Sequence, residues 1–179
     1  MKNKALRIRY TVTPCPLGNL LVAATEKGIC SVMLGTSPAE LEALLVKEYP
    51  HAEFHRDPAG LDRWVRVLLK YLNGQQRALD LPLDVRGTAF QQRVWEELRR
   101  IPYGSTRTYS DIARAVGRPK ASRAVARACA TNPVALLIPC HRVVRKGGDP
   151  GGFGWGVERK RALLALEQSV LLSSPGSSS

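Results

Sequence analysis

The segment 108–144 reads "TYSDIARAVGRPKASRAVARACATNPVALLIPCHRVV" and contains the strongest structural signals in the chain. Thr108 predicts the start of a short helix that Gly117 ends, and a second helix is expected over residues 120–131 after Pro119. Two short helices joined by a turn that contains glycine have the pattern of a helix-turn-helix. Many helical bundles contain such a pair, so the pattern needs support from other features.

The charge balance gives that support. The 179 residues include 27 Lys and Arg against 15 Asp and Glu, a formal net charge of +12 at pH 7. Such an excess favours a polyanionic partner, most simply nucleic acid, although a merely soluble basic surface is the alternative. No apolar run approaches the roughly 20 residues of a membrane-spanning helix. No apolar segment of a secretory signal follows the basic N-terminus. We therefore expect a cytoplasmic protein with no membrane association.

The second predicted helix combines small side chains with two arginines, Arg123 and Arg127, one turn apart. A thin helix face lets the backbone approach a groove closely, and arginines reach phosphates or insert between bases. Close packing against another helix is the alternative use of so many alanines. With the charge excess, the pattern favours DNA contact, and the other residues expected at this contact are Ala121, Ser122 and Ala124.

Cys140 and His141 follow Pro139 at the end of an apolar run that we expect to be a strand. A cysteine becomes a strong nucleophile as its thiolate, and a nearby histidine can take the proton. Adjacent side chains of a strand point to opposite faces, so the pair cooperates only through a turn or a bridging water. The last helix is expected to begin near Val157, and Glu167 falls on its apolar stripe, where an unpaired carboxylate is costly. Orienting His141 would complete a Cys-His-Glu relay, whereas a glutamate that reaches solvent is the alternative.

The first half of the chain predicts a small antiparallel sheet with helices. Apolar residues alternate over 8–13, 19–24 and 28–34, which indicates a meander of three strands. Capping signals and apolar spacing then predict helices over 37–48 and 61–72. The sequence as a whole therefore predicts an α+β protein.

Residues 73–87 have the composition of a connection, and a capping box at Thr88 begins the next helix. We expect an N-terminal α/β lobe over 1–80 and a C-terminal lobe with the helix-turn-helix and the reactive cysteine over 81–172. The Ser/Gly/Pro-rich segment 173–179 is expected to be a disordered tail. The four cysteines and three histidines form no metal-binding spacing, so no metal is expected.

Three phrases strongly resemble the O6-alkylguanine-DNA alkyltransferases: "YGSTRTYSDIA" at 103–113, "RAVARACATNP" at 123–133 and "IPCHRVV" at 138–144. The resemblance extends from about residue 8 to 167. It implies an α+β fold of two lobes, a C-terminal DNA-binding and alkyl-acceptor domain, and a helix-turn-helix that binds the minor groove of double-stranded DNA.

The phrases "GTAFQQRVW" at 87–95 and "GWGVERK" at 154–160 look most like the C-terminal part of bacterial adaptive-response proteins. The zinc-binding regulatory domain of those proteins has no counterpart in this sequence. The resemblance therefore implies either a stand-alone repair enzyme or one half of a longer protein.

The resemblance implies a chemical role for five residues. Cys140 is the acceptor thiol, His141 deprotonates it through a bridging water, and Glu167 polarises His141. Asn132 tightens the turn before the active-site segment, and Tyr109 helps to swing the target nucleotide and gives a proton to the leaving guanine. The implied reaction is stoichiometric transfer of a methyl or alkyl group from O6-alkylguanine, and also from O4-alkylthymine, to Cys140. The thioether product does not hydrolyse, so one molecule repairs one lesion.

The resemblance also implies that Arg123 fills the gap in the base stack after the damaged base is flipped out. No cofactor is implied, and the protein is expected to be a monomer in solution. Trp155 stands where some relatives carry a small residue, which predicts a narrow pocket that accepts methyl better than benzyl groups. The residues implied to line the base pocket are Cys129, Val143, Phe153, Gly154 and Trp155.

Two other functions remain open from the residues. A thiol hydrolase or protease would also use a Cys-His-Glu set, but it would turn over repeatedly and would not need the basic helix pair. A non-catalytic protein that binds alkylated DNA would lack the acceptor cysteine, whereas Cys140 is present.

Overall fold

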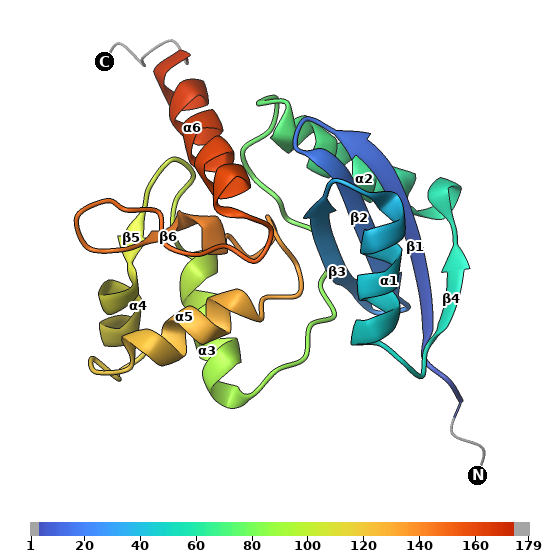
Figure 1. Cartoon of the computed structure of the whole chain (residues 1–179), viewed down its shortest axis with the longest axis horizontal. Helices are drawn as coiled ribbons and strands as arrows, with labels where there is room; N and C mark the ends of the chain where they lie inside the picture. The colour runs from blue at the N-terminus through green and yellow to red at the C-terminus, as the bar shows by residue number, and fades with distance from the viewer. Residues whose placement is uncertain (1–3, 174–179) are drawn as a thin grey trace.

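The computed structural model describes residues 4–173, which form an N-terminal lobe around a sheet and a C-terminal lobe of helices (Figure 1). The first three strands are neighbours in an antiparallel meander, as their alternating sequence predicts. A fourth strand was not predicted, because its four residues are mostly exposed and lack apolar alternation. It pairs parallel to β1 and gives the sheet order β3-β2-β1-β4. The strands are β1 Arg7–Cys15, β2 Gly18–Thr25, β3 Gly28–Gly35 and β4 Glu53–Arg56.

Two helices cover the opposite faces of this sheet: α1 (Pro38–Glu48) and α2 (Pro58–Leu72) (Figure 1). The side chains of β2 alternate between the two resulting cores, because successive residues of a strand face opposite sides. Leu20 packs in the core with α2, while Leu21 packs in the core with α1. Strand β2 is therefore buried on both faces and belongs to both hydrophobic cores of the lobe.

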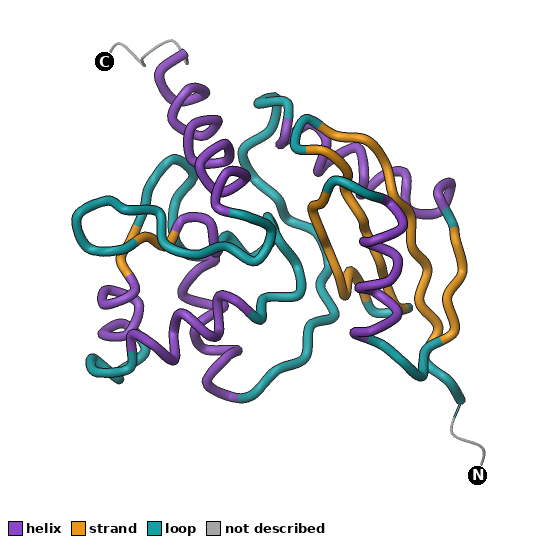
Figure 2. Tube along the Cα trace, in the orientation of Figure 1, coloured by secondary structure: helices purple, strands orange, loops and turns teal. Residues whose placement is uncertain are grey.

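The C-terminal lobe follows a long connection over residues 73–88 that joins α2 to α3 (Figure 2). Thr88 and Thr108 each begin a helix with a reciprocal capping box, as the sequence predicts for Thr88. A short parallel pair of strands, β5 and β6, links the start of the helix-turn-helix to the segment after the Cys-His pair. The elements are α3 Ala89–Arg99, β5 Arg107–Thr108, α4 Tyr109–Ala115, α5 Ser122–Ala130, the 3-10 helix η1 Cys140–Arg142, β6 Val143–Val144 and α6 Val157–Ser173.

The helix-turn-helix consists of α4 and α5, but α5 begins two residues later than expected, at Ser122. Pro119 lies in a turn that the Ala121 N–H closes by donating to the Arg118 carbonyl at 2.9 Å. Proline suits the second position of such a turn because its φ angle is already fixed near the required value. The proline therefore forms the turn between the helices and does not begin the second one.

Residues 134–138, predicted as an apolar strand, form turns instead. Asn132 provides the reason, because its side chain accepts from the Val134 N–H and donates to the Ile138 carbonyl. Leu136 has a φ of 73°, which no extended strand contains. A single bridge from Val134 to Val32 connects this segment to β3 of the other lobe. The segment thus packs as buried turns between the lobes.

The last helix, α6, begins at Val157 as predicted and lies beside both lobes (Figure 1). Near its start, Arg159 donates to the Leu17 carbonyl of the N-terminal lobe at 2.8 Å. Ser173 belongs to this helix and not to the predicted tail, and residues 174–179 lie outside the described part of the chain. No helix within residues 4–173 is long and apolar enough to cross a lipid bilayer.

Trp155, just before α6, packs against both hydrophobic cores. We expect Trp155→Ala to lower the free energy of unfolding by about 2 kcal/mol, because truncating a partly buried aromatic side chain leaves unfilled space. Urea unfolding followed by circular dichroism measures the effect. Leu172→Ala is the control, since Leu172 is 85% exposed. Equal unfolding midpoints for the two variants would contradict this role of Trp155.

Candidate active site

A cavity of about 490 Å³ opens between the helix-turn-helix and the loop that precedes α6. Small side chains of α5, Ala126 and Ala130, form part of its wall and leave room for a ligand. Cys140 lies at this cavity, and Arg145 and Gly152 contribute from the loop. Six further lining residues were expected to bind DNA, act in catalysis or form the pocket: Tyr109, Ser122, Arg123, Cys129, Phe153 and Gly154.

Cys140 is the first residue of η1 and is only 6% exposed. Burial raises the pKa of its thiol, and the Asn132 hydrogen bond and the Lys160 charge oppose that rise. The Asn132 amide donates to the Cys140 sulfur at 3.3 Å and to the Ile138 carbonyl at 2.7 Å. One amide side chain therefore fixes both the turn and the position of the thiol.

His141 is fully buried beside Glu167, with 2.6 Å between the imidazole Nε2 and the carboxylate Oε2. A carboxylate partner at Nε2 favours the tautomer with its proton on that nitrogen, which leaves Nδ1 as the acceptor. Nδ1 has no hydrogen-bond partner within residues 4–173. Burial lowers the pKa of His141 below its ordinary value of 6.5, although the Glu167 contact acts in the opposite direction. The imidazole is therefore neutral at pH 7 and able to accept a proton.

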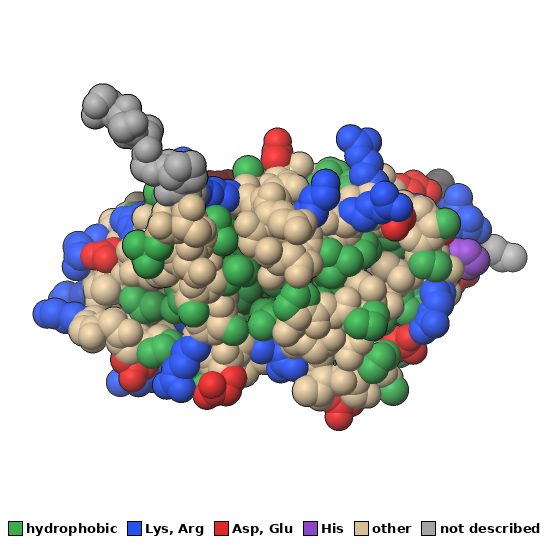
Figure 3. Space-filling model, turned by 90° about the horizontal axis from the view of Figure 1, so that it is seen from above, with side chains coloured by type: hydrophobic (Ala, Val, Ile, Leu, Met, Phe, Trp, Pro, Cys, Tyr) green, Lys and Arg blue, Asp and Glu red, His purple; other side chains and the backbone are tan. Residues whose placement is uncertain are grey.

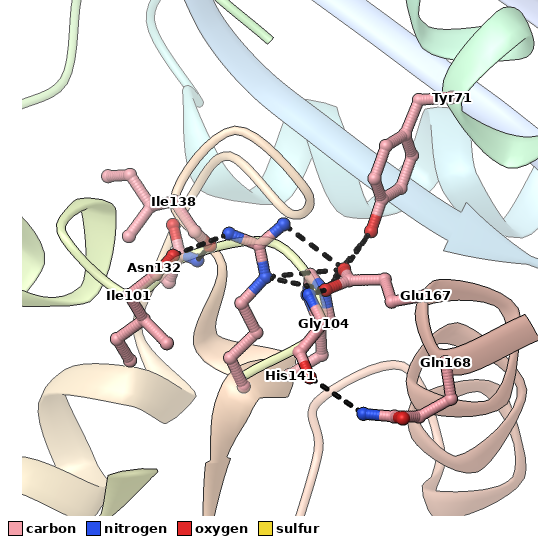
Figure 4. Close-up of polar contacts among 9 residues, drawn as sticks. Tyr71, Ile101, Gly104, Asn132, Ile138, His141, Glu167 and Gln168 are labelled. Atoms are coloured by element: carbon pink, nitrogen blue, oxygen red, sulfur yellow. Dashed lines mark hydrogen bonds and ion pairs between the residues drawn. The ribbon is translucent and has the colours of Figure 1, made fainter. Parts of the chain in front are cut away.

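Glu167 receives hydrogen bonds from several elements (Figure 4). Its Oε1 accepts from Arg142 Nε at 2.8 Å and from the Gly104 N–H at 2.9 Å. Its Oε2 accepts from Arg142 Nη2 at 3.1 Å and from the Tyr71 hydroxyl at 2.5 Å. Burial disfavours the charged carboxylate, but the hydrogen bonds of His141, Arg142 and Tyr71 outweigh this and lower its pKa to about 2. The carboxylate is therefore ionised at neutral pH despite being 1% exposed.

Lys160 is a buried cation that the residue patterns did not single out. Its ammonium group donates to the Val143 carbonyl at 2.6 Å and to the Gly152 carbonyl at 3.2 Å, and lies 3.5 Å from the Tyr109 hydroxyl. Burial lowers its pKa. The sequence did contain one indication of this burial. Lys160 is seven residues before Glu167 and therefore lies on the same helix face.

Tyr71 is the second missed residue, and it comes from the other lobe. It belongs to the apolar stripe of α2, is 0% exposed and donates to Glu167. A buried tyrosine hydroxyl usually has a hydrogen-bond partner, which makes a tyrosine on an apolar stripe a usable signal. The identity of that partner depends on how the two lobes pack, which the stripe does not reveal.

Two residues expected in the base pocket lie elsewhere. Val143 is fully buried in β6, where its carbonyl accepts from Lys160. Trp155 packs against the hydrophobic cores. Neither is among the residues that line the cavity. A pocket that Trp155 narrows stays a prediction. The loop reaches the cavity through Phe153 and Gly154 instead.

The residues expected to contact DNA lie on α5 or at its start. Arg123 and Arg127 are exposed, and Ala124 is partly exposed. Ala121 is the N-cap of the helix, and Ser122 is its first residue. Figure 3 shows lysine and arginine side chains at both ends of one face, over both lobes, so the positive charge is not confined to this helix.

Two family models match consecutive parts of the chain. The ribonuclease-like domain of 6-O-methylguanine DNA methyltransferase matches residues 8–85, and the DNA-binding domain matches residues 89–169. The boundary between the two matches falls in the connection before α3.

Curated relatives and solved structures agree with these matches. The bifunctional transcriptional activator/DNA repair enzyme Ada of Escherichia coli is 49% identical over 90% of this chain, but the match spans only 46% of Ada. The methylated-DNA–protein-cysteine methyltransferase of Mycobacterium tuberculosis is 42% identical over 90% of this chain and 93% of that protein.

The crystal structure of M. tuberculosis O6-methylguanine methyltransferase superposes with a TM-score of 0.78 and 37% identity, covering 94% of this chain and 96% of that one. A second structure, M. tuberculosis OGT in complex with DNA, has a TM-score of 0.76 and 38% identity over 92% and 94% of the two chains. With the fold, the cavity and these relatives in agreement, the chain belongs to the 6-O-methylguanine DNA methyltransferase family.

Proposed function

We propose that this protein repairs alkylated DNA by moving the alkyl group of O6-alkylguanine, and of O4-alkylthymine, irreversibly to Cys140. One observation carries the proposal: Cys140 lines the same cavity as Tyr109 and Arg123 of the helix-turn-helix. The next residue, His141, is hydrogen-bonded to the ionised Glu167. A nucleophile, a base and an orienting carboxylate thus occur next to a DNA-binding motif.

In the proposed reaction, neutral His141 takes the thiol proton of Cys140 through a bridging water. The thiolate attacks the alkyl carbon, the carbon–oxygen bond breaks, and its electron pair stays on the guanine. Burial raises the pKa of Tyr109 to about 12, so its hydroxyl is protonated and can give a proton to the leaving base. The proton that His141 takes from the thiol then restores the Tyr109 hydroxyl, so one proton in total passes from the thiol to the guanine. The thioether keeps the alkyl group, so the protein acts once.

A base inside a duplex cannot reach a buried thiol, so the damaged nucleotide has to flip out of the helix. Unstacking costs a few kcal/mol, which contacts in the cavity and a side chain in the vacated stack offset. Arg123 is exposed and lines the cavity, which suits it to that second role. The cavity and the His-Glu pair are complete within one chain, which supports action on double-stranded DNA as a monomer. A cytoplasmic location stays a prediction from the sequence.

A thiol hydrolase would use the same three groups but would regenerate its thiol. We expect wild-type protein mixed with duplex DNA containing O6-methylguanine to reach a plateau of about one methyl group per protein, because a thioether resists hydrolysis. Mass spectrometry of the Cys140 peptide measures the added methyl group, and Cys140→Ser is the inactive control. Continued turnover with an unmodified thiol would favour the hydrolase.

Arg123→Ala is expected to slow transfer from duplex DNA about tenfold or more, because flipping loses the side chain that fills the stack. Transfer from the free base O6-methylguanine needs no flipping and should change little. Arg66→Ala removes the same charge from an exposed pair with Asp62 on α2 and is the matched control. Equal rates for the two variants on duplex DNA would contradict the role of Arg123.

The lowered pKa of His141 predicts how transfer depends on pH. The base form persists below the ordinary histidine value of 6.5, so the rate should hold as the pH falls to that value and decline only below it. Single-turnover rates across the acid range measure the profile. His141→Gln should lower the rate by about 100-fold and remove this decline, because the general base is lost. A decline centred well above 6.5 in the wild type would argue against a neutral buried histidine.

A further inference from the structure

Tyr71 of α2 brings a side chain of the N-terminal lobe to the candidate active site. Its ring is fully buried, and its hydroxyl lies 2.5 Å from Glu167 Oε2 and 3.1 Å from His141 Nε2 (Figure 4). The rest of this cluster, Gly104, His141, Arg142 and Glu167, belongs to the C-terminal lobe. The hydroxyl therefore contacts both members of the His-Glu pair from outside their own lobe.

The Tyr71 hydroxyl can act toward Glu167 only as a donor. Burial raises the pKa of Tyr71 far above neutrality, and the charge of Glu167 raises it further, so the phenol stays protonated. Its hydrogen bond ends on Oε2, the same carboxylate oxygen that faces His141. A donor on that oxygen stabilises the carboxylate charge. The carboxylate then stabilises the protonated, positively charged form of the imidazole less strongly. Tyr71 thus limits how strongly Glu167 favours the protonated imidazole.

We propose that Tyr71 is a positioning residue of the alkyl-transfer reaction, which keeps His141 a neutral base by sharing Oε2 of Glu167 with it. The inference rests on the proposed function, in which His141 takes the thiol proton. It assigns the N-terminal lobe a part in the chemistry in addition to its structural role. The lobe supplies the hydrogen bond only when α2 is docked against α6.

Other groups also act on His141 and have to stay constant in a test. Arg142 of η1 and Lys160 of α6 lower its pKa by their positive charges, while Glu167 raises it. Cys140 precedes it in η1. Removing only the Tyr71 oxygen leaves these four groups in place, so Tyr71→Phe isolates the contribution of the hydroxyl.

Tyr103 offers a matched control in the same cluster. Its ring packs edge-on against Tyr71 with 6.0 Å between the ring centroids, and its hydroxyl is also buried. That hydroxyl has no hydrogen-bond partner in the described part of the chain. Tyr103→Phe therefore removes a neighbouring phenol oxygen without removing a hydrogen bond to Glu167.

The first experiment measures single-turnover methyl transfer as a function of pH for the wild type, Tyr71→Phe and Tyr103→Phe. Without the Tyr71 donor, Glu167 holds the imidazolium more strongly, so the acid midpoint of the profile should rise by about half a pH unit or more. For a rise of half a unit, the rate below the wild-type midpoint should fall by up to about threefold, and near pH 8 it should change little. Tyr103→Phe should keep the wild-type midpoint.

The second measurement does not depend on transfer. Nitrogen-15 NMR of labelled histidine follows the protonation of His141 directly, and Tyr71→Phe should raise its midpoint by the same amount. If the wild type transfers no methyl group but the NMR midpoint of His141 still rises in Tyr71→Phe, the proposed function alone is rejected. An unchanged midpoint in Tyr71→Phe by NMR, or equal shifts in Tyr71→Phe and Tyr103→Phe, would overturn the inference.

Discussion

The buried carboxylate of Glu167 is the interaction on which the rest of the site depends. A charge that is 1% exposed persists only if hydrogen bonds replace its lost hydration, and α2, the loop at Gly104 and η1 together supply them. These contacts fix the position of α6 against the C-terminal lobe and the orientation of His141. The same network therefore stabilises the packing of three segments and defines the proposed base.

Asn132 has a comparable role for the nucleophile. Its amide connects the end of α5 to the turns at 134–138 and to the sulfur of Cys140. Because α5 also carries Arg123, the helix proposed to contact DNA and the thiol proposed to receive the alkyl group are held by one side chain. Asn132 thus fixes the position of α5 relative to the thiol of Cys140. A fixed distance between them suits a reaction that needs accurate placement of a flipped base.

Local patterns predicted the elements whose stability is local. The alternation of β1 to β3, the capping box at Thr88 and the start of α6 were all visible in the sequence. Strand β4 was not, because its mostly exposed residues lack apolar alternation and its strand form depends on pairing with β1. The segment 134–138 was misjudged because a side chain, Asn132, satisfies its backbone in place of a sheet ladder. Tyr71 was missed because its partner Glu167 lies in the other lobe. Lys160 was missed because its partners come from separate segments of its own lobe, at Tyr109, Val143 and Gly152.

His141 is buried and Arg123 is exposed, so dissolved ions screen the charges around these two residues to different extents. His141 and Glu167 interact away from solvent, where dissolved ions screen little, whereas Arg123 and Arg127 are exposed to the ion atmosphere. Added electrolyte competes with phosphates for exposed arginines and leaves a buried pair almost unaffected. Under the proposed function, ionic strength therefore governs how often the protein binds a lesion and leaves the transfer step on the bound lesion unchanged.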